Sequence, residues 1–337
     1  MASFRSVYCK FSECNVRPAN IAELVLALWL VVGPAAWGQT WPVRPISVVV
    51  PFTPGTGIDL VARGVGARLS ERLGVPVVID NRAGASGNIG SEFVARAAPD
   101  GHILIVTAGT FVNNTAVNSN LRYDPIRDFA PIALLATGAQ MFIVGPASSA
   151  TSVKEVVAMA IARPGKMFYA SPGNGTIHHL AMELFKFETG ADIVHVPYKG
   201  FGGAINDVVG GRVEAMILPM AAAAPYVQSR QVRVLAVLSK ERAALFPNVP
   251  TLGEEGYPGV QADNWYAMLA PARTPAEVVT RLNTETNAVL RDPAMSEALL
   301  KQSLVAAGGP AELLASLMKS EMERWRRVAI HAKIRAD

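Results

Sequence analysis

The chain has 337 residues, half of them apolar and 17% charged, with a formal net charge of +4. This length is ample for a buried core and can supply two domains. The near balance of acidic and basic residues argues against nucleic acid as a partner.

The first 38 residues have the pattern of an export signal that is removed from the mature protein. Basic residues precede an apolar stretch from Leu24 to Val32, and the small residues Ala36 and Gly38 precede Gln39. The apolar stretch is shorter than the roughly 20 residues that a membrane-spanning helix needs. We therefore expect an exported protein that is cleaved near Gly38/Gln39.

Both cysteines, Cys9 and Cys14, lie in this leader. The mature chain is therefore expected to have no thiol for a disulfide, a zinc site or a nucleophile.

From Ile46 onward, short runs rich in Val, Ile and Leu alternate with segments of helical period. This alternation predicts an α/β fold with mainly parallel sheets. Ten strands are expected, which exceeds what one sheet comfortably holds, so we predict two sheets. The expected strands are 46–50, 76–79, 103–107, 132–135, 141–144, 168–170, 193–196, 215–218, 232–238 and 265–269.

Three helices carry clear sequence signals. Apolar residues recur every fourth position after the first strand, at Val61, Val65, Leu69 and Leu73, and Gly74 is placed to end that helix. The segments 152–155 and 274–277 have the spacing of a capping box, in which a Ser or Thr and a Glu cap a helix start.

Four loops share one design, in which a strand ends in small and polar residues before a helix begins. They are "VVVPFTPGTGID" (48–59), "VTAGTFVNN" (106–114), "YASPGNGTIHHL" (169–180) and "VPYKGFGGAIND" (196–207). Loops at the carboxyl ends of parallel strands meet at one crevice of an α/β sheet, and helix starts there favour anions. The sequence therefore predicts a site for a small carboxylate.

Catalytic and metal-binding patterns are absent from the sequence as read. There is no dinucleotide fingerprint, no P-loop and no G-x-S-x-G, since "GASG" at 84–87 is one residue short. His178, His179 and His195 lack the spacing of a metal site, which favours structural roles for them. We predict no catalytic residue, no metal and no cofactor.

Several long motifs resemble the solute-binding proteins of tripartite tricarboxylate transporters, also called the Bug family. The resemblance spans residues 41–334. It is carried by "RPISVVVPFTPGTGIDLVAR", "VVIDNRAGASGNIGSEFVARAAPDGHILIV", "YDPIRDFAPIALLA", "PGKMFYASPGNGTIHHLAMELFK", "VHVPYKGFGGAINDVVGGRVEAMI" and "APARTPAEVVTRLN", in that order.

The resemblance implies a two-domain periplasmic-binding-protein-like fold of type II, with the ligand cleft between the domains. One domain would comprise 39–143 and 261–337, and the other 144–260. By position, the ligand contacts that the resemblance implies are Thr53, Gly55, Thr56, Gly57, Asp59, Thr110, Ser171, Gly173, Gly175, Thr176, Gly202 and Asp207.

The resemblance implies a periplasmic, monomeric protein that captures an organic acid for uptake and meets membrane transporter subunits transiently. Where the family commonly has a second glycine and a hydroxyl residue before the aspartate, this chain has Thr56 and Ile58. The acid itself is left open among aromatic acids, dicarboxylates, tricarboxylates and amino acids. Two other functions stay open: a sensor that presents the solute to a membrane receptor, and an exported hydrolase on the same fold.

Overall fold

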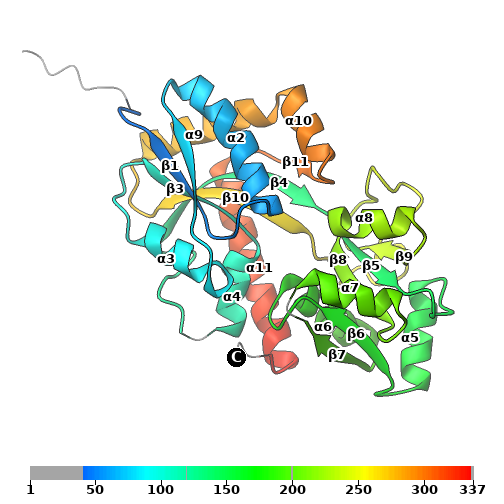
Figure 1. The fold of residues 1–337 in the computed structure, drawn as a ribbon. Helices are drawn as coiled ribbons and strands as arrows, with labels where there is room; N and C mark the ends of the chain where they lie inside the picture. Colours follow the sequence, from blue (N-terminus) through cyan, green and yellow to red (C-terminus); the bar gives the residue numbers. More distant parts are fainter. Residues whose placement is uncertain (1–40, 119, 199, 335–337) are drawn as a thin grey trace, which may run out of the picture. The chain divides into compact units, whose positions relative to one another are not determined.

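The computed structural model describes residues 41–118, 120–198 and 200–334. The expected export signal and its cleavage site lie outside these ranges. Residues Pro42–Asp337 form one compact unit, which contains two β-sheets flanked by helices (Figure 1). The α/β class and the two sheets are as predicted.

The first sheet has six strands in the order β11-β4-β10-β3-β1-β2. Strand β1 is parallel to β2 and β3, whereas β10 is antiparallel to both β3 and β4. The strands are β1 (Ile46–Val50), β2 (Val77–Asn81), β3 (Ile103–Ala108), β4 (Phe129–Gly138), β10 (Asn264–Pro271) and β11 (Val305–Ala306).

The second sheet has five strands in the order β7-β6-β8-β5-β9. Strand β6 is parallel to β7 and β8, and β5 is antiparallel to β8 and β9. The strands are β5 (Gln140–Val144), β6 (Met167–Ser171), β7 (Ile193–Pro197), β8 (Ala215–Pro219) and β9 (Arg233–Val237).

All ten expected strands are present, but the prediction of mainly parallel sheets is wrong. Five of the nine strand pairings among the described residues are antiparallel. The reason lies in the two places where the chain crosses between the sheets. It leaves through β4 straight into β5 and returns through β10, and each of these strands runs against its neighbours. Strand β11 is missing from the prediction because two residues carry no readable alternation.

Helix α2 follows β1 and forms because its apolar side chains recur on one face. Val61, Val65 and Leu69 are buried, and Gly74 ends the helix with a left-handed backbone, as predicted. Helix α2 spans Gly57–Leu73. The strands of the first sheet are followed by one 3-10 turn, η1 (Ala85–Gly87), and by five further helices: α3 (Asn88–Ala95), α4 (Thr110–Val117), α9 (Ala276–Leu290), α10 (Pro293–Leu300) and α11 (Ala311–His331).

One of the two expected capping boxes is present. The Ser152 hydroxyl accepts from the Glu155 amide at the start of α5. Helix α9, in contrast, begins at Ala276 with Pro275 as its N-cap, and the Thr274 hydroxyl donates to the Pro271 carbonyl instead. The helices between the strands of the second sheet are α5 (Val153–Ala162), α6 (Ile177–Thr189), α7 (Phe201–Val209) and α8 (Met220–Gln228).

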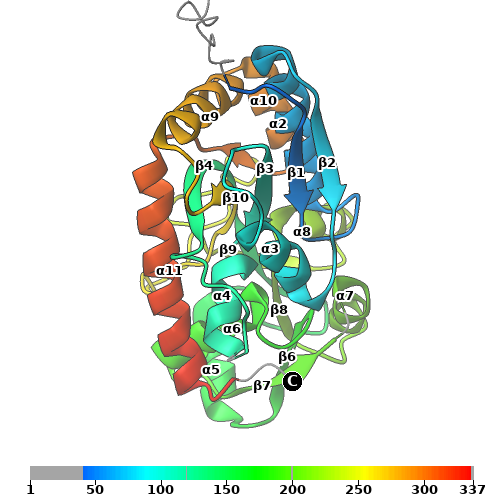
Figure 2. The same cartoon turned by 90° about the vertical axis from the view of Figure 1, so that its left-hand side faces the viewer.

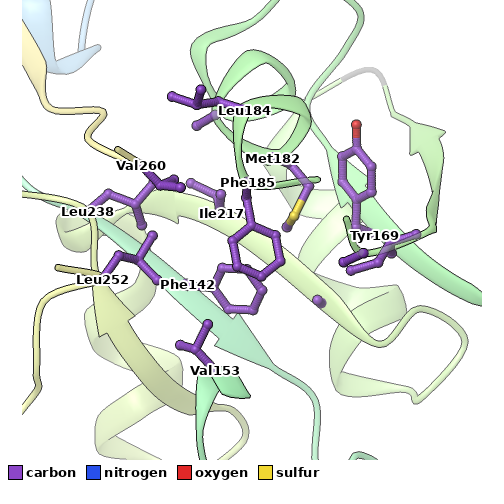
Figure 3. Close-up of a cluster of buried hydrophobic side chains, with 14 of the residues drawn as sticks. Phe142, Val153, Tyr169, Met182, Leu184, Phe185, Ile217, Leu238, Leu252 and Val260 are labelled. Carbon is purple, nitrogen blue, oxygen red and sulfur yellow. The ribbon is translucent and has the colours of Figure 1, made fainter. Parts of the chain in front are cut away.

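Each sheet has its own buried core. Phe142 and Phe185 pack against each other at 5.0 Å between ring centres in the core of the second sheet (Figure 3). Phe111 packs against Phe129 at 4.8 Å in the core of the first sheet.

Helix α11 belongs to both cores. Its first half contributes Leu314 and Met318 to the first core, and its second half contributes Trp325 and Ala329 to the second. Figure 2 shows the helix running alongside α4 and α6, and both contacts are present in the structure. No helix in the described part of the chain has the length and apolarity required to cross a membrane.

Candidate functional site

A cavity of about 190 Å³ lies between η1, α3 and α4, which follow strands of the first sheet, and the β6–α6 loop of the second sheet. We call it the asparagine cavity. Its lining carries no charged side chain and consists of Ala85, Ser86, Asn88, Thr110, Asn114, Val117 and Asn118 from the first half of the chain, with Asn174, Gly175 and Thr176 from the β6–α6 loop.

The wall formed by η1 has an unusual backbone. Gly84, Ala85, Ser86 and Gly87 all have positive φ, at 134°, 47°, 56° and 90°, although Ala and Ser rarely adopt such angles. The Asn114 side-chain amide holds this turn in place by donating to the Ser86 carbonyl at 3.0 Å. Strained backbone of this kind persists where the surroundings impose it, and it is concentrated at functional sites.

Two helices begin at the cavity, one from each side. Helix α3 starts at Asn88, and helix α6 is capped by Thr176. The first turn of a helix has N–H groups without an intrahelical partner and the positive end of the helix dipole, so both starts favour an anion. The cavity can therefore attract negative charge without a cationic side chain.

The β6–α6 loop is shaped by hydroxyl groups that face inward. The Ser171 hydroxyl is fully buried and lies 2.6 Å from His195 Nε2, so it is not exposed to the cavity. The Thr176 hydroxyl donates to the Gly173 carbonyl at 2.9 Å and accepts from the His179 amide at 3.4 Å. Of these predicted contacts, Thr176 lines the cavity, whereas Ser171 and Gly173 support the loop behind it.

Two stacked histidines, His179 and His195, also contact the β6–α6 loop. His179 Nδ1 accepts from the Gly175 amide at 3.0 Å, and the His179 and His195 rings stack at 3.8 Å. Burial lowers the pKa of His179 to about 4 and that of His195 to about 3. Both rings are consequently neutral at physiological pH, which suits two imidazoles in direct contact.

The first loop is placed elsewhere. Asp59 is buried and accepts from the Gly55 amide, Arg63 and Asn81, each at 2.9 Å. Burial alone would raise the pKa of Asp59, but these hydrogen bonds together lower it, so the carboxylate stays charged. The Thr56 hydroxyl donates to the Thr53 carbonyl at 2.9 Å. These residues organise the loop and do not line the asparagine cavity.

Gly57, at the end of that loop, lines a second cavity of about 210 Å³, which we call the tyrosine cavity. Tyr266 and Met220 are among its other lining residues. A Cβ added at Gly57 would lie 2.9 Å from the Tyr266 hydroxyl oxygen, so the glycine is needed for this close approach.

The fourth predicted loop lines neither cavity. Gly202 lies in the first turn of α7 and has open space where a side chain would point. Asp207 lies near the end of that helix and accepts from the Tyr198 hydroxyl at 2.5 Å and from Arg212. Burial and the neighbouring Asp207 raise the pKa of Tyr198 to about 12.

The structure thus brings together three predicted residues, Thr110, Gly175 and Thr176, with others that sequence reasoning missed. The missed residues are Ala85, Ser86, Asn88, Asn114, Val117, Asn118 and Asn174. A usable signal was present, because Thr110, Asn114 and Asn118 are spaced by four residues and so share one helix face. Within the described ranges, no group of three or more His, Cys, Asp or Glu residues is arranged to hold a metal.

Two solved structures with this architecture hold a carboxylate. The protein Rpa4515 of R. palustris, solved with adipate, is 35% identical with a TM-score of 0.76 and covers 88% of this chain and 99% of its own. MatC of Rhodopseudomonas palustris, solved with bound malate, is 31% identical with a TM-score of 0.72 and covers 86% and 99%. The periplasmic binding protein BugD is 30% identical with a TM-score of 0.73 and covers 88% and 100%.

The family comparison agrees with these structures. Residues 61–333 match the family described as tripartite tricarboxylate transporter family receptor. This match includes every strand of both sheets except β1. The chain therefore belongs to the tripartite tricarboxylate transporter receptor family, which is a family of solute-binding receptors.

Proposed function

We propose that this protein captures a small organic acid in the asparagine cavity and delivers it to the membrane subunits of a tripartite tricarboxylate transporter. The observation that supports this most is the convergence of two helix starts, at Asn88 and Thr176, on a cavity without charged side chains. Relatives with bound adipate and malate support the same ligand class.

Recognition without a cation has a clear physical basis. A hydrogen bond to a charged group contributes about 1.5–3 kcal/mol, and a few oriented amides can therefore hold a carboxylate once water is excluded. Ordered water can bridge the remaining distance between a carboxylate and a polar wall. A neutral wall also leaves the ligand free to dissociate when the receptor meets its transporter.

We further propose two domains, 39–143 with 261–337 and 144–260, that close on the ligand about a hinge near Val144 and Ala262. The first sheet lies in the first of these domains and the second sheet in the other, except that most of β5 (Gln140–Val144) falls before the boundary at 144, which would therefore move to the β4–β5 junction at Ala139. The crossing segments are tied through Leu238, whose amide donates to the Gln140 carbonyl at 2.9 Å. The Leu238 carbonyl in turn accepts from the Ala262 amide at 3.2 Å. Such short ties between crossing segments suit a hinge that bends without unfolding.

We place the mature protein in the periplasm as a monomer, with cleavage near Gly38/Gln39. Its kinship with periplasmic binding proteins such as BugD supports this location. The contact with transporter subunits would be transient, because the receptor must release its ligand and depart.

A thermal-shift screen tests the proposed function. The purified protein is heated with each of a panel of mono-, di- and tricarboxylates, and each acid is paired with its neutral amide as a control. An acid at a hundredfold excess over its Kd adds about 2.7 kcal/mol of stability, whereas its amide should add far less. If no carboxylate raises the melting temperature, the proposed function is wrong.

A further inference from the structure

Two neighbouring asparagines in the cavity wall have side-chain orientations that a backbone carbonyl dictates. The Asn114 side chain has one atom 3.0 Å from the Ser86 carbonyl oxygen. A carbonyl only accepts, so this atom is Nδ2, the donor. The same Nδ2 lies 2.7 Å from a side-chain atom of Asn88, which must therefore be the acceptor Oδ1.

The Tyr123 hydroxyl supports this assignment. It lies 3.0 Å from Asn88 Oδ1 and can donate to it. Burial raises the pKa of Tyr123, so the phenol keeps the proton that this hydrogen bond uses. Asn88 Oδ1 thus receives two donors, and neither asparagine can be turned over without placing two like groups in contact.

The fixed orientations leave one atom of each side chain for a ligand. Asn88 has its Nδ2 donor left over, and Asn114 has its Oδ1 acceptor left over, which receives no hydrogen bond from a described residue. Asn118 presents a donor, because its Oδ1 accepts from the Asn120 amide at 2.9 Å. Among these three asparagines, Asn88 and Asn118 therefore offer donors, whereas Asn114 offers an acceptor, which suits a different chemical group of the ligand.

We propose that the ligand is a hydroxycarboxylate, whose carboxylate is held at the α3 start and Asn88 Nδ2 and whose hydroxyl donates to Asn114 Oδ1. This inference rests on the proposed function and narrows its ligand class. A second carboxylate oxygen opposite Asn114 Oδ1 would be repelled, and a methylene would leave the acceptor without a partner. An ammonium group is disfavoured, because it would face the positive end of α3 with no carboxylate in the cavity lining.

The experiment compares acids that differ by one hydroxyl group. Isothermal titration calorimetry on the purified protein measures succinate against malate, adipate against 2-hydroxyadipate, and phenylacetate against mandelate, with both enantiomers of each hydroxy acid. Aspartate is added beside malate as the ammonium analogue. We expect the better enantiomer of at least one hydroxy acid to bind about tenfold or more tightly than its parent and than the amino analogue.

Two variants locate the preference. Asn114→Ala removes the acceptor, so the affinity ratio of hydroxy acid to parent should fall from about ten to near one. Asn118→Ala is the matched control: it removes a cavity carboxamide that presents a donor, and it should weaken both members of a pair alike. A substitution that only distorts the site should weaken the hydroxy acid and its parent acid equally, so it leaves their affinity ratio unchanged. Thermal unfolding shows whether each variant is folded.

The outcomes separate the two proposals. A parent acid that binds as tightly as its hydroxy partner, or aspartate that binds more tightly than malate, overturns the inference but leaves carboxylate binding standing. A hydroxyl preference that survives in Asn114→Ala also overturns it. If no acid of these pairs and no carboxylate of the thermal-shift panel binds, the proposed function fails, and the inference fails with it.

Discussion

At the residue scale, Asp263 is placed where its charge is costly. It lies just before β10, where the chain returns to the first sheet, and its Oδ1 has no hydrogen-bond partner. Burial raises its pKa to about 6, although Arg324 of α11 acts in the opposite direction and Glu321 reinforces the rise. Arg324 is itself buried, and this lowers its pKa.

The raised pKa of Asp263 predicts a pH dependence with a definite sign. The native state holds this proton more tightly than the unfolded chain, so the contribution of Asp263 to stability is fully present below about pH 4 and is lost as the pH rises through about 6, the pKa of Asp263. The loss from this group is on the order of 2–3 kcal/mol. Asp263→Asn should remove it, which urea denaturation of both proteins at pH 4.5 and 7.5 would measure.

The comparison at pH 7.5 is the sharper half of that test. We expect Asp263→Asn to be at least as stable as the natural protein there, because the amide avoids a buried charge. A variant that is less stable at pH 7.5 would mean that attraction to Arg324 outweighs the cost of burial.

Some single residues of the candidate site could be predicted from sequence, and others could not. Thr176 was expected among the ligand contacts, and it does line the asparagine cavity. Ser171 was expected to face a ligand, but its hydroxyl lies against His195, 24 positions away. The direction of a hydroxyl depends on such distant partners, which local sequence does not contain.

At the element scale, the loop before α6 is held against α4 by a glycine. Gly175 has a φ of +70°, and a Cβ there would lie 2.9 Å from Val117 Cγ2. Gly190, which ends α6, has nearly the same φ of +71° but nothing within 4 Å. Both glycines are therefore needed for their left-handed backbone, but only Gly175 is also needed for the close approach to Val117.

Alanine at each of these positions gives a matched pair. Gly190→Ala should cost about 1 kcal/mol of stability, because only the left-handed backbone is disfavoured. Gly175→Ala should cost more, and it should also weaken binding of any carboxylate found in the screen, since the cavity wall must move. Chemical denaturation and calorimetry check this, and equal effects of both variants would contradict it.

Elements themselves were largely predictable, because periodicity is a local property. The α2 stripe and the ten strands follow directly from the spacing of apolar residues. Strand direction was not predictable in the same way: β5 and β10 have ordinary buried sequences, and their antiparallel pairing follows from where the chain crosses between sheets. The cap at Thr274 failed because its hydroxyl found a nearer carbonyl at Pro271.

At the scale of the whole molecule, α11 couples the two cores. Trp325 is fully buried in the second core, and its Nε1 donates to Glu321 Oε2 at 2.6 Å, while Leu314 lies in the first core. The periodicity of α11 does not predict this division, because apolar residues have the same spacing whether they pack into one core or into two. The expected assignment of 261–337 to one domain did not anticipate it.

Replacing Trp325 tests this coupling. Trp325→Ala should lower the free energy of unfolding by about 3–5 kcal/mol, through lost burial and the cavity left behind. Because one helix serves both cores, the variant should still unfold in a single transition, with far-ultraviolet circular dichroism and tyrosine fluorescence changing together. Two separated transitions would show that the cores are independent.

Domain closure is the second property at this scale. If the proposed hinge operates, a binding carboxylate should reduce the radius of gyration measured by small-angle X-ray scattering. Because α11 packs into both cores, we expect only a modest reduction. An unchanged radius at saturating ligand would count against closure and would leave a preformed cavity as the alternative.

The position of α11 after the last strand, β11, makes the protein sensitive to premature termination. A nonsense codon shortly before Ala311 would leave every described strand of both sheets encoded. It would nevertheless strip Leu314 and Met318 from one core and Trp325 and Ala329 from the other. Truncated products of this kind should be degraded by cellular proteases, whatever the state of the ligand cavity.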